Sequence, residues 1–176
     1  MTIYLARHGQ TDYNHTRRFQ GQMDVPLNFT GRTQAKALAS RVASLGLVAL
    51  WSSPLARARE TAEAVSVQIG LPVRVDARLM ETDTGVWTDR LYAELEAADP
   101  VAYQGFVTGA EGFGFEGGES YVEQGDRVMA ALAEISSGPR PALVVCHGMV
   151  MRLAMRRLGV ESAAGIENAE LVSLPL

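Results

Sequence analysis

Two hydrophobic patterns alternate along the chain. Short apolar runs predict strands, most of them buried on both faces, at residues 2–6, 47–51, 72–75, 141–146 and 170–174. Elsewhere apolar residues recur every three or four positions, which predicts amphipathic helices at about 30–45, 54–69, 90–98, 120–135 and 148–158. The alternation of the two patterns indicates an α/β fold, with a mainly parallel sheet covered on both faces.

Residues that favour helix ends support these helices. Thr30 is expected to cap the first long helix and Gly46 to end it. Ser53 is the expected cap of the next helix, with Pro54 at its first position. The helix over 120–135 is expected to turn four apolar residues inward, namely Val122, Val128, Leu132 and Ile135.

Two segments fit neither pattern. Residues 8–29 form a long polar stretch, and such a connection in a compact domain is usually functional. Residues 105–118 are rich in glycine and carry several phenylalanines, after a proline at position 100 that is expected to break the preceding helix. We find no internal repeat and no linker, so residues 1–176 are expected to form a single domain.

Composition excludes several classes of protein. With 47% hydrophobic and 20% charged residues among 176, the chain suits one soluble domain, and no apolar run is long enough to span a membrane. The net charge of −4 disfavours nucleic acid and anionic membranes as partners. One cysteine cannot form an internal disulfide, and the first residues do not resemble a signal peptide. A cytoplasmic protein, monomeric or homodimeric, is expected.

Candidate chemistry lies where strands pass into helices, because ligands of α/β sheets bind beyond the carboxyl ends of the strands. Three such junctions carry Arg7-His8-Gly9, Arg57 shortly after Ser53, and His147-Gly148. A single histidine or arginine there would be unremarkable, but two of each converging at one edge favour a phosphate dianion as ligand. Gly9 and Gly148 would let the backbone approach that anion. Cys146 points to the opposite face from His147, so it is expected to be a core residue.

Six ordered blocks then carry a resemblance to a known family. Residues 7–14, Arg-His-Gly-Gln-Thr-Asp-Tyr-Asn, resemble the RHG(E/Q)TxxN signature of the histidine phosphatase superfamily, which includes cofactor-dependent phosphoglycerate mutases. The resemblance continues through residues 18–35, 52–62 (Ser-Ser-Pro-Leu-Ala-Arg-Ala and Thr-Ala), 79–87 (Leu-Met-Glu, then Gly-Val-Trp), 117–120 (Gly-Gly-Glu-Ser) and 144–152. It implies a three-layer α/β/α fold of the phosphoglycerate mutase type.

The resemblance also implies the roles of the site residues. His8 would attack phosphorus and become a phosphohistidine, with one ring nitrogen held as N–H by a backbone carbonyl. Arg7, Arg57 and His147 would clamp the phosphoryl oxygens. Glu81 would protonate the leaving alkoxide and then activate water, with Asp83 as a competing candidate. Neutral donors would come from Asn14, Gln20 and Gly21. No metal ion or cofactor is implied, and His15 is expected at the surface.

Three functions stay open on the sequence. The favoured one is a phosphomonoesterase that hydrolyses a small phosphorylated metabolite. A mutase is disfavoured because residues 82–146 supply only Arg90, Arg127 and Arg140 as basic groups, and a binding module without turnover because every chemical position is present. The family's variable segment, about 88–118 here, is expected to cover the pocket as a lid, and Trp87 lacks the Glu-Gly that follows it in many phosphatases. Three arginines of the helix over 148–158 are expected to be solvated, namely Arg152, Arg156 and Arg157.

Overall fold

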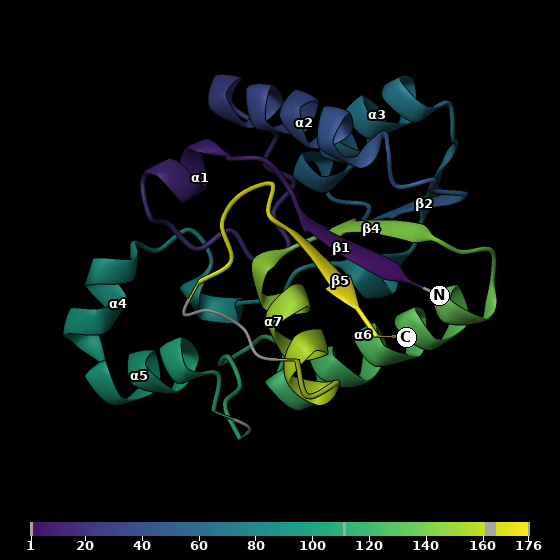
Figure 1. The fold of residues 1–176 in the computed structure, drawn as a ribbon. Helices are drawn as coiled ribbons and strands as arrows, with labels where there is room; N and C mark the ends of the chain where they lie inside the picture. The colour runs from purple at the N-terminus through teal and green to yellow at the C-terminus, as the bar shows by residue number, and fades with distance from the viewer. Residues whose placement is uncertain (1, 111, 161–164, 176) are drawn as a thin grey trace.

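The described residues form a five-stranded sheet in the order β3-β2-β4-β1-β5. The structure is a computed structural model and describes residues 2–110, 112–160 and 165–175 (Figure 1). The strands are β1 (Ile3–Arg7), β2 (Ala49–Ser52), β3 (Val73–Val75), β4 (Ala142–Cys146) and β5 (Leu171–Leu174). Neighbouring strands are parallel except at one edge, where β5 runs antiparallel to β1. The predicted mainly parallel sheet is confirmed.

Helices cover both faces of this sheet, as predicted. Figure 1 shows α2 (Phe29–Val42) and α3 (Ala56–Ile69) on one face, and α6 (Tyr121–Ser137) and α7 (Gly148–Arg157) on the other. The shorter helices lie near the carboxyl ends of the strands: α1 (Asp12–His15), α4 (Tyr92–Ala98) and α5 (Pro100–Thr108). Two 3₁₀ turns, η1 (Ala77–Leu79) and η2 (Gly85–Trp87), follow β3.

The alternation of side chains along β4 explains why its sequence is apolar throughout. Ala142, Val144 and Cys146 pack against α6 and α7, whereas Leu143 and Val145 pack against α2 and α3. All five are fully buried. Burial raises the pKa of the Cys146 thiol, so this cysteine is the core residue that the sequence predicted.

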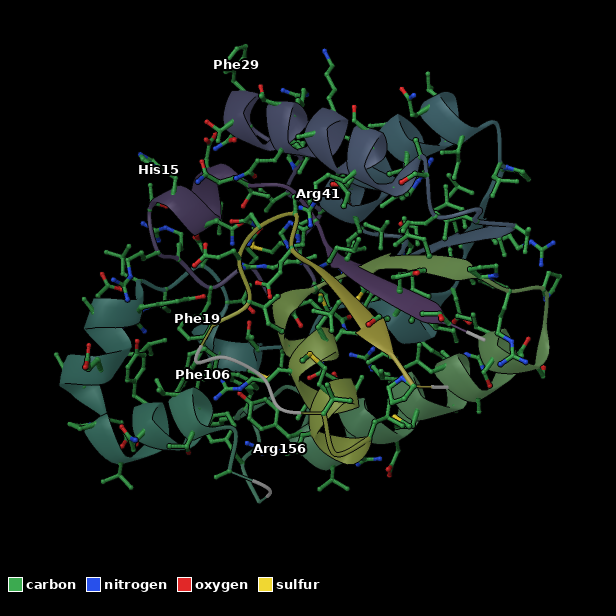
Figure 2. All side chains as sticks on the ribbon, viewed as in Figure 1. His15, Phe19, Phe29, Arg41, Phe106 and Arg156 are labelled. Atoms are coloured by element: carbon green, nitrogen blue, oxygen red, sulfur yellow. The ribbon has the colours of Figure 1, made fainter. Side chains whose placement is uncertain are left out.

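An aromatic core sits beside the sheet, at the end where the strands finish. Rings from the α4–α5 region, from the segment before α6 and from the loop before α2 contact one another, and Figure 2 labels Phe19 and Phe106, whose centroids are 4.9 Å apart. The buried members are Phe19, Trp87, Leu95, Tyr103, Phe115, Tyr121 and Leu153. This core anchors the glycine-rich segment to the rest of the molecule.

Helix starts differ from the sequence predictions at three places. Asn28 caps α2 in place of Thr30, because its side-chain oxygen accepts from Gly31 N at 2.8 Å. The helix α3 begins after Leu55, without a side-chain cap. Ser53 therefore does not cap it and is directed to the site described below. Pro100 begins α5 in place of ending the helical region, since Asp99 caps that helix through Ala102 N at 2.9 Å.

The expected inward face of α6 is correct except at Val122, which is 45% exposed. The helix begins at Tyr121, and that residue faces the core in its place. Within the described part of the chain, no helix is long and apolar enough to cross a membrane.

Candidate active site

The carboxyl ends of β1, β4 and β2 bring the predicted residues together. His8 directly follows β1, His147 follows β4 and Ser53 follows β2, and the rings of His8 and His147 lie 5.1 Å apart between centroids. A cavity of about 440 Å³ opens at this edge of the sheet. Its lining includes eight of the ten expected site residues, namely Arg7, His8, Asn14, Gln20, Gly21, Arg57, Glu81 and Gly148.

His8 is held as a neutral imidazole with one fixed tautomer. Its Nδ1 lies 2.7 Å from the Gly9 carbonyl oxygen, and since a carbonyl can only accept, Nδ1 donates the proton. The lone pair is therefore on Nε2. Burial, followed by the positive charges of Arg57 and Arg7, holds the pKa of His8 well below its usual value. The expected neutral ring with a backbone partner is present.

Arg57 is a fully buried cation beside His8. It stands in the first turn of α3, and its two terminal nitrogens donate to the carbonyl oxygens of Met23 and Gly21, each at 2.8 Å. Burial lowers the pKa of Arg57 to about 10, while the carboxylates of Glu81 and Asp24 oppose that effect. The guanidinium thus keeps its charge at neutral pH.

Three buried nitrogens at this edge have no hydrogen-bond partner among the described residues: Arg7 Nε, Arg57 Nε and His147 Nδ1. The other ring nitrogen of His147 is 2.8 Å from Ser53 Oγ. Burial and then the charge of Arg57 hold the pKa of His147 well below its usual value. The two arginine nitrogens are donors, and Nδ1 of the neutral His147 is a donor in the tautomer whose Nε2 accepts from the Ser53 hydroxyl. Buried donors without partners are costly, and an anion with several oxygens would satisfy them.

The glycines of the site have different reasons for being glycine. A Cβ on Gly9 would lie 2.4 Å from the Gly31 carbonyl oxygen, and the Gly9 N–H already donates to Thr61 Oγ1 at 3.1 Å. Gly9 does not line the cavity, so its expected contact with the anion is not supported, and it serves packing and the orientation of His8. Gly148 does line the cavity, at the N-terminus of α7.

Asn14 and Gln20 are fixed by the same threonine. Asn14 Oδ1 accepts from the backbone N–H of Thr11 at 3.1 Å, in a capping box that starts α1. Gln20 Oε1 accepts from Thr11 Oγ1 at 2.9 Å. With both amide oxygens occupied, the amide nitrogens are the atoms that each side chain can offer to a ligand.

Glu81, and not Asp83, faces the cavity. The carboxylate of Glu81 accepts from Thr82 N at 3.0 Å and from Met149 N at 3.4 Å. Asp83 lies outside the lining and accepts from Gly85 N at 3.0 Å, at the start of η2. Of the two carboxylates that the sequence left as candidates, Glu81 is the one that lines the cavity.

Sequence reasoning located part of the outer wall, since the segment over 88–118 supplies Tyr92, Tyr103, Phe106, Val107 and Phe115 to the lining. Arg152 lines the cavity although it was expected to be solvated, whereas Arg156 and Arg157 are exposed as expected. His15 lies at the surface, as Figure 2 shows. The lining residues that the sequence did not single out are Arg17, Phe19, Thr82, Thr84, Met149, Gly165 and Ile166. Their amphipathic or loop context carries no signal that separates them from core residues.

Among the described residues, no three His, Cys, Asp or Glu side chains lie close enough together to hold a metal ion. The sheet edge instead gathers two neutral histidines, two arginines and one carboxylate around a cavity. An α/β protein with such an edge has the groups for phosphoryl transfer through histidine. The family model of the histidine phosphatase superfamily (branch 1) matches residues 3–174, and the chain belongs to this superfamily.

Enzymes of two kinds occur among similar proteins. The probable phosphoglycerate mutase GpmB of Salmonella paratyphi B is 40% identical over 154 residues, which are 86% of this chain and 71% of that protein. The mycobacterial glucosyl-3-phosphoglycerate phosphatase, solved with VO3, is 34% identical with a TM-score of 0.89, over 98% of this chain and 90% of the other. The protein TTHB049 of Thermus thermophilus is 30% identical with a TM-score of 0.82, over 99% and 94% of the two chains.

Proposed function

We propose that the protein is a phosphomonoesterase that works through a phosphohistidine on His8. The observation that carries this proposal is the fixed tautomer of His8, which leaves the lone pair on Nε2 of a neutral ring whose pKa burial and the charges of Arg57 and Arg7 lower. In the first step Nε2 bonds to phosphorus, the ester P–O bond breaks, and protonated Glu81 gives its proton to the leaving alkoxide. In the second step water attacks the phosphohistidine and Glu81 takes up its proton, which frees inorganic phosphate and His8.

The charges around His8 support this reaction. Arg7 and Arg57 would hold the phosphoryl oxygens both in the bound ester and in the phosphohistidine. They would also stabilise the charge on these oxygens in the in-line transition state. His147 Nδ1 and the amide of Asn14 would complete the set of donors. These side chains supply the positive charge that a metal ion provides elsewhere, and we expect a chelator to leave the rate unchanged.

The direct test is loss of the nucleophile. His8→Ala should abolish hydrolysis of p-nitrophenyl phosphate while the protein stays folded, and an acid-labile phosphoryl group should be trapped on the wild type during turnover. Inhibition by vanadate together with phosphate release would exclude a protein that only binds phosphoesters. Near-normal turnover by His8→Ala would refute the nucleophile.

Phosphoglycerate mutase is the second candidate, because curated relatives are named for that activity. The basic residues between Glu81 and His147 do not favour a mutase. Arg90 pairs with Glu94 on the surface, and Arg127 pairs with Glu119; neither lines the cavity. With 3-phosphoglycerate as substrate, a phosphatase releases inorganic phosphate, whereas a mutase accumulates 2-phosphoglycerate without release.

The outer wall favours a leaving group with a ring-shaped or apolar body and an acidic group. Phe19, Tyr92 and Phe106 supply flat surfaces, and Arg17 and Arg152 supply charge; neither arginine forms an ion pair with a described carboxylate. Burial raises the pKa of Tyr92, and the charges of Arg7 and Arg17 oppose this. The sugar and glycerate groups in the substrate named for the mycobacterial phosphatase have this character.

Paired substrates test that preference. Phenyl phosphate and 4-carboxyphenyl phosphate differ in one acidic group, and the second should have the higher kcat/KM in the wild type. Arg152→Met should remove the difference mainly through KM. A preference for the uncharged ester in the wild type would contradict the assignment of the outer wall.

A further inference from the structure

Nothing regular in the backbone holds Glu81 in place. Residues 80–84 lie between η1 and η2 and belong to neither a helix nor a strand. A general acid must nevertheless meet the leaving oxygen within hydrogen-bond reach, and an error of about 1 Å can cost on the order of a hundredfold in rate. The contacts that fix this segment therefore bear on catalysis.

Arg127 of α6 binds the backbone carbonyl groups of Glu81 and of two residues that precede it. Its Nη1 donates to the oxygens of Arg78 and Met80, each at 2.7 Å, and its Nη2 donates to the Glu81 oxygen at 3.1 Å. The same guanidinium donates to the two carboxylate oxygens of Glu119, from Nε to Oε1 at 2.6 Å and from Nη2 to Oε2 at 2.7 Å. Both side chains are mostly buried, at 20% and 15% exposure, so the pair is little screened by solvent.

Glu119 ties the far side of the same loop. Its backbone N–H donates to the Asp83 carbonyl at 2.9 Å. Gly118 packs so closely that a Cβ would lie 2.4 Å from that carbonyl oxygen and 2.6 Å from Gly85 N. Residues 117–119, Gly-Gly-Glu, have no part in the proposed chemistry. They pack against the loop that carries Glu81.

Gln124 reaches the carboxyl group itself. It is fully buried and stands three residues before Arg127, on the same face of α6. Its Oε1 accepts from Thr82 Oγ1 at 2.5 Å, and its Nε2 donates to Glu81 Oε1 at 3.4 Å. One face of α6 therefore holds both the backbone and the side chain of Glu81.

We propose that Arg127, held by Glu119, is a positioning residue that sets where the Glu81 carboxyl group meets the leaving oxygen. The inference rests on the proposed role of Glu81 as general acid. Arg127 does not line the cavity, and its hydrogen bonds go to the loop of Glu81 and to Glu119. Its charge also contributes to lowering the pKa of His147, but a change at His147 would affect every phosphoester alike. Removal of Arg127 should therefore impair only reactions whose leaving group needs a proton.

The test compares p-nitrophenyl phosphate, whose phenolate leaves without much protonation, with glycerol 3-phosphate, whose alkoxide needs a proton. Arg127→Met should lower kcat for glycerol 3-phosphate by about tenfold to a hundredfold and change that for the aryl ester by less than about threefold. Arg78→Met is the matched control. Arg78 also links η1 to α6, through Glu134, but at the surface, and its loss should affect neither substrate.

The Glu81→Gln background shows whether the effect passes through Glu81. There, adding Arg127→Met should lower glycerol 3-phosphate hydrolysis no further. Equal losses on the two esters, or a further tenfold loss in this background, would overturn the positioning role. If Glu81→Gln itself lowers kcat equally for both esters, the proposed role of Glu81 as general acid is wrong, and this outcome is distinct from a failure of the positioning role.

Two milder variants keep the test open should Arg127→Met not fold. Arg127→Lys keeps the charge but cannot span three carbonyls and a carboxylate, so the selective defect should persist. Glu119→Gln keeps an acceptor and removes the charge, and a smaller defect of the same selectivity is expected. A folded Glu119→Gln protein with an unchanged ratio of alkyl to aryl activity would overturn the proposal as well.

Discussion

Replacing Arg57 with methionine should remove activity and lower stability only moderately. Lowering the pKa of Arg57 from 12.5 to about 10 corresponds, at about 1.4 kcal/mol per pKa unit, to about 3 kcal/mol of destabilisation by the buried charge. Methionine removes that penalty, but it leaves the carbonyls of Gly21 and Met23 without their donor, at about 1–3 kcal/mol each. The two effects largely offset each other, so the free energy of unfolding should fall by no more than about 3 kcal/mol.

The same substitution should lower the catalytic rate far more than it lowers the stability. Arg57 adjoins the nucleophile and would hold a phosphoryl oxygen, and loss of one such donor lowers kcat by about two to four orders of magnitude. Thermal unfolding and kcat with p-nitrophenyl phosphate measure the two effects on one preparation. Arg59→Met is the control, since Arg59 lies two residues later on α3, exposed and paired with Glu63, and its loss should change neither quantity.

Phosphate provides the third measurement. An anion that partners Arg57 binds only the folded protein, so phosphate or vanadate should raise the Tm of the wild type and not that of Arg57→Met. A variant that keeps most of its activity, or that loses more than about 10 °C in Tm at unchanged activity, would show that Arg57 supports the fold and not the anion site.

Two further predictions concern pH and packing. Between pH 6.5 and 5.5 the phosphate-free protein should lose up to about 1.4 kcal/mol of stability per pH unit for each of His8 and His147, because the lowered pKa values keep both rings unprotonated in the folded state while the unfolded chain binds protons. Urea unfolding measures the free energy of unfolding at each pH, and its slope against pH should be smaller in His8→Gln. An unchanged slope would contradict this. Gly9→Ala should destabilise by about 1–3 kcal/mol by thermal unfolding, since the Gly31 backbone cannot yield, whereas Gly112→Ala, with nothing within 4 Å, should be near neutral.

The fold was predictable wherever burial dictates the pattern. The strands β1 and β4 are buried between two helical layers, so nearly every residue must be apolar and the run is unmistakable. Sequence preferences for helix ends failed where one residue satisfies two opposing preferences. Pro100 disfavours the interior of a helix but favours its first turn, and only the Asp99 cap decides that a helix begins there.

The candidate site divides in the same way. His8, Arg57 and His147 were predictable because the carboxyl ends of parallel strands meet at one edge. Arg152 was not, because an arginine on an amphipathic helix looks the same in the sequence whether it faces solvent or a cavity. The packing role of Gly9 was not predictable for a related reason, since its close contact with Gly31 joins segments whose packing no local pattern reveals.

The glycine-rich segment is the last feature that the sequence left open, between a mobile lid and a fixed wall. Its structure favours a wall over residues 113–121. Phe115 N donates to Glu119 O at 3.2 Å, Gly118 N to Phe115 O at 3.0 Å and Tyr121 N to Phe113 O at 3.0 Å. Phe115 is only 6% exposed, within the aromatic core.

Amide hydrogen exchange distinguishes the lid from the wall. Glu111 lies outside the described residues, so the prediction concerns the amides of Phe115, Gly118 and Tyr121. Each is hydrogen-bonded within or beside a buried ring cluster, and opening them would expose several aromatic side chains together. These amides should therefore exchange slowly in the free protein, and vanadate with glycerol should change their rates little. Fast exchange that slows when vanadate binds would instead show that the segment closes over the phosphoryl group as a lid.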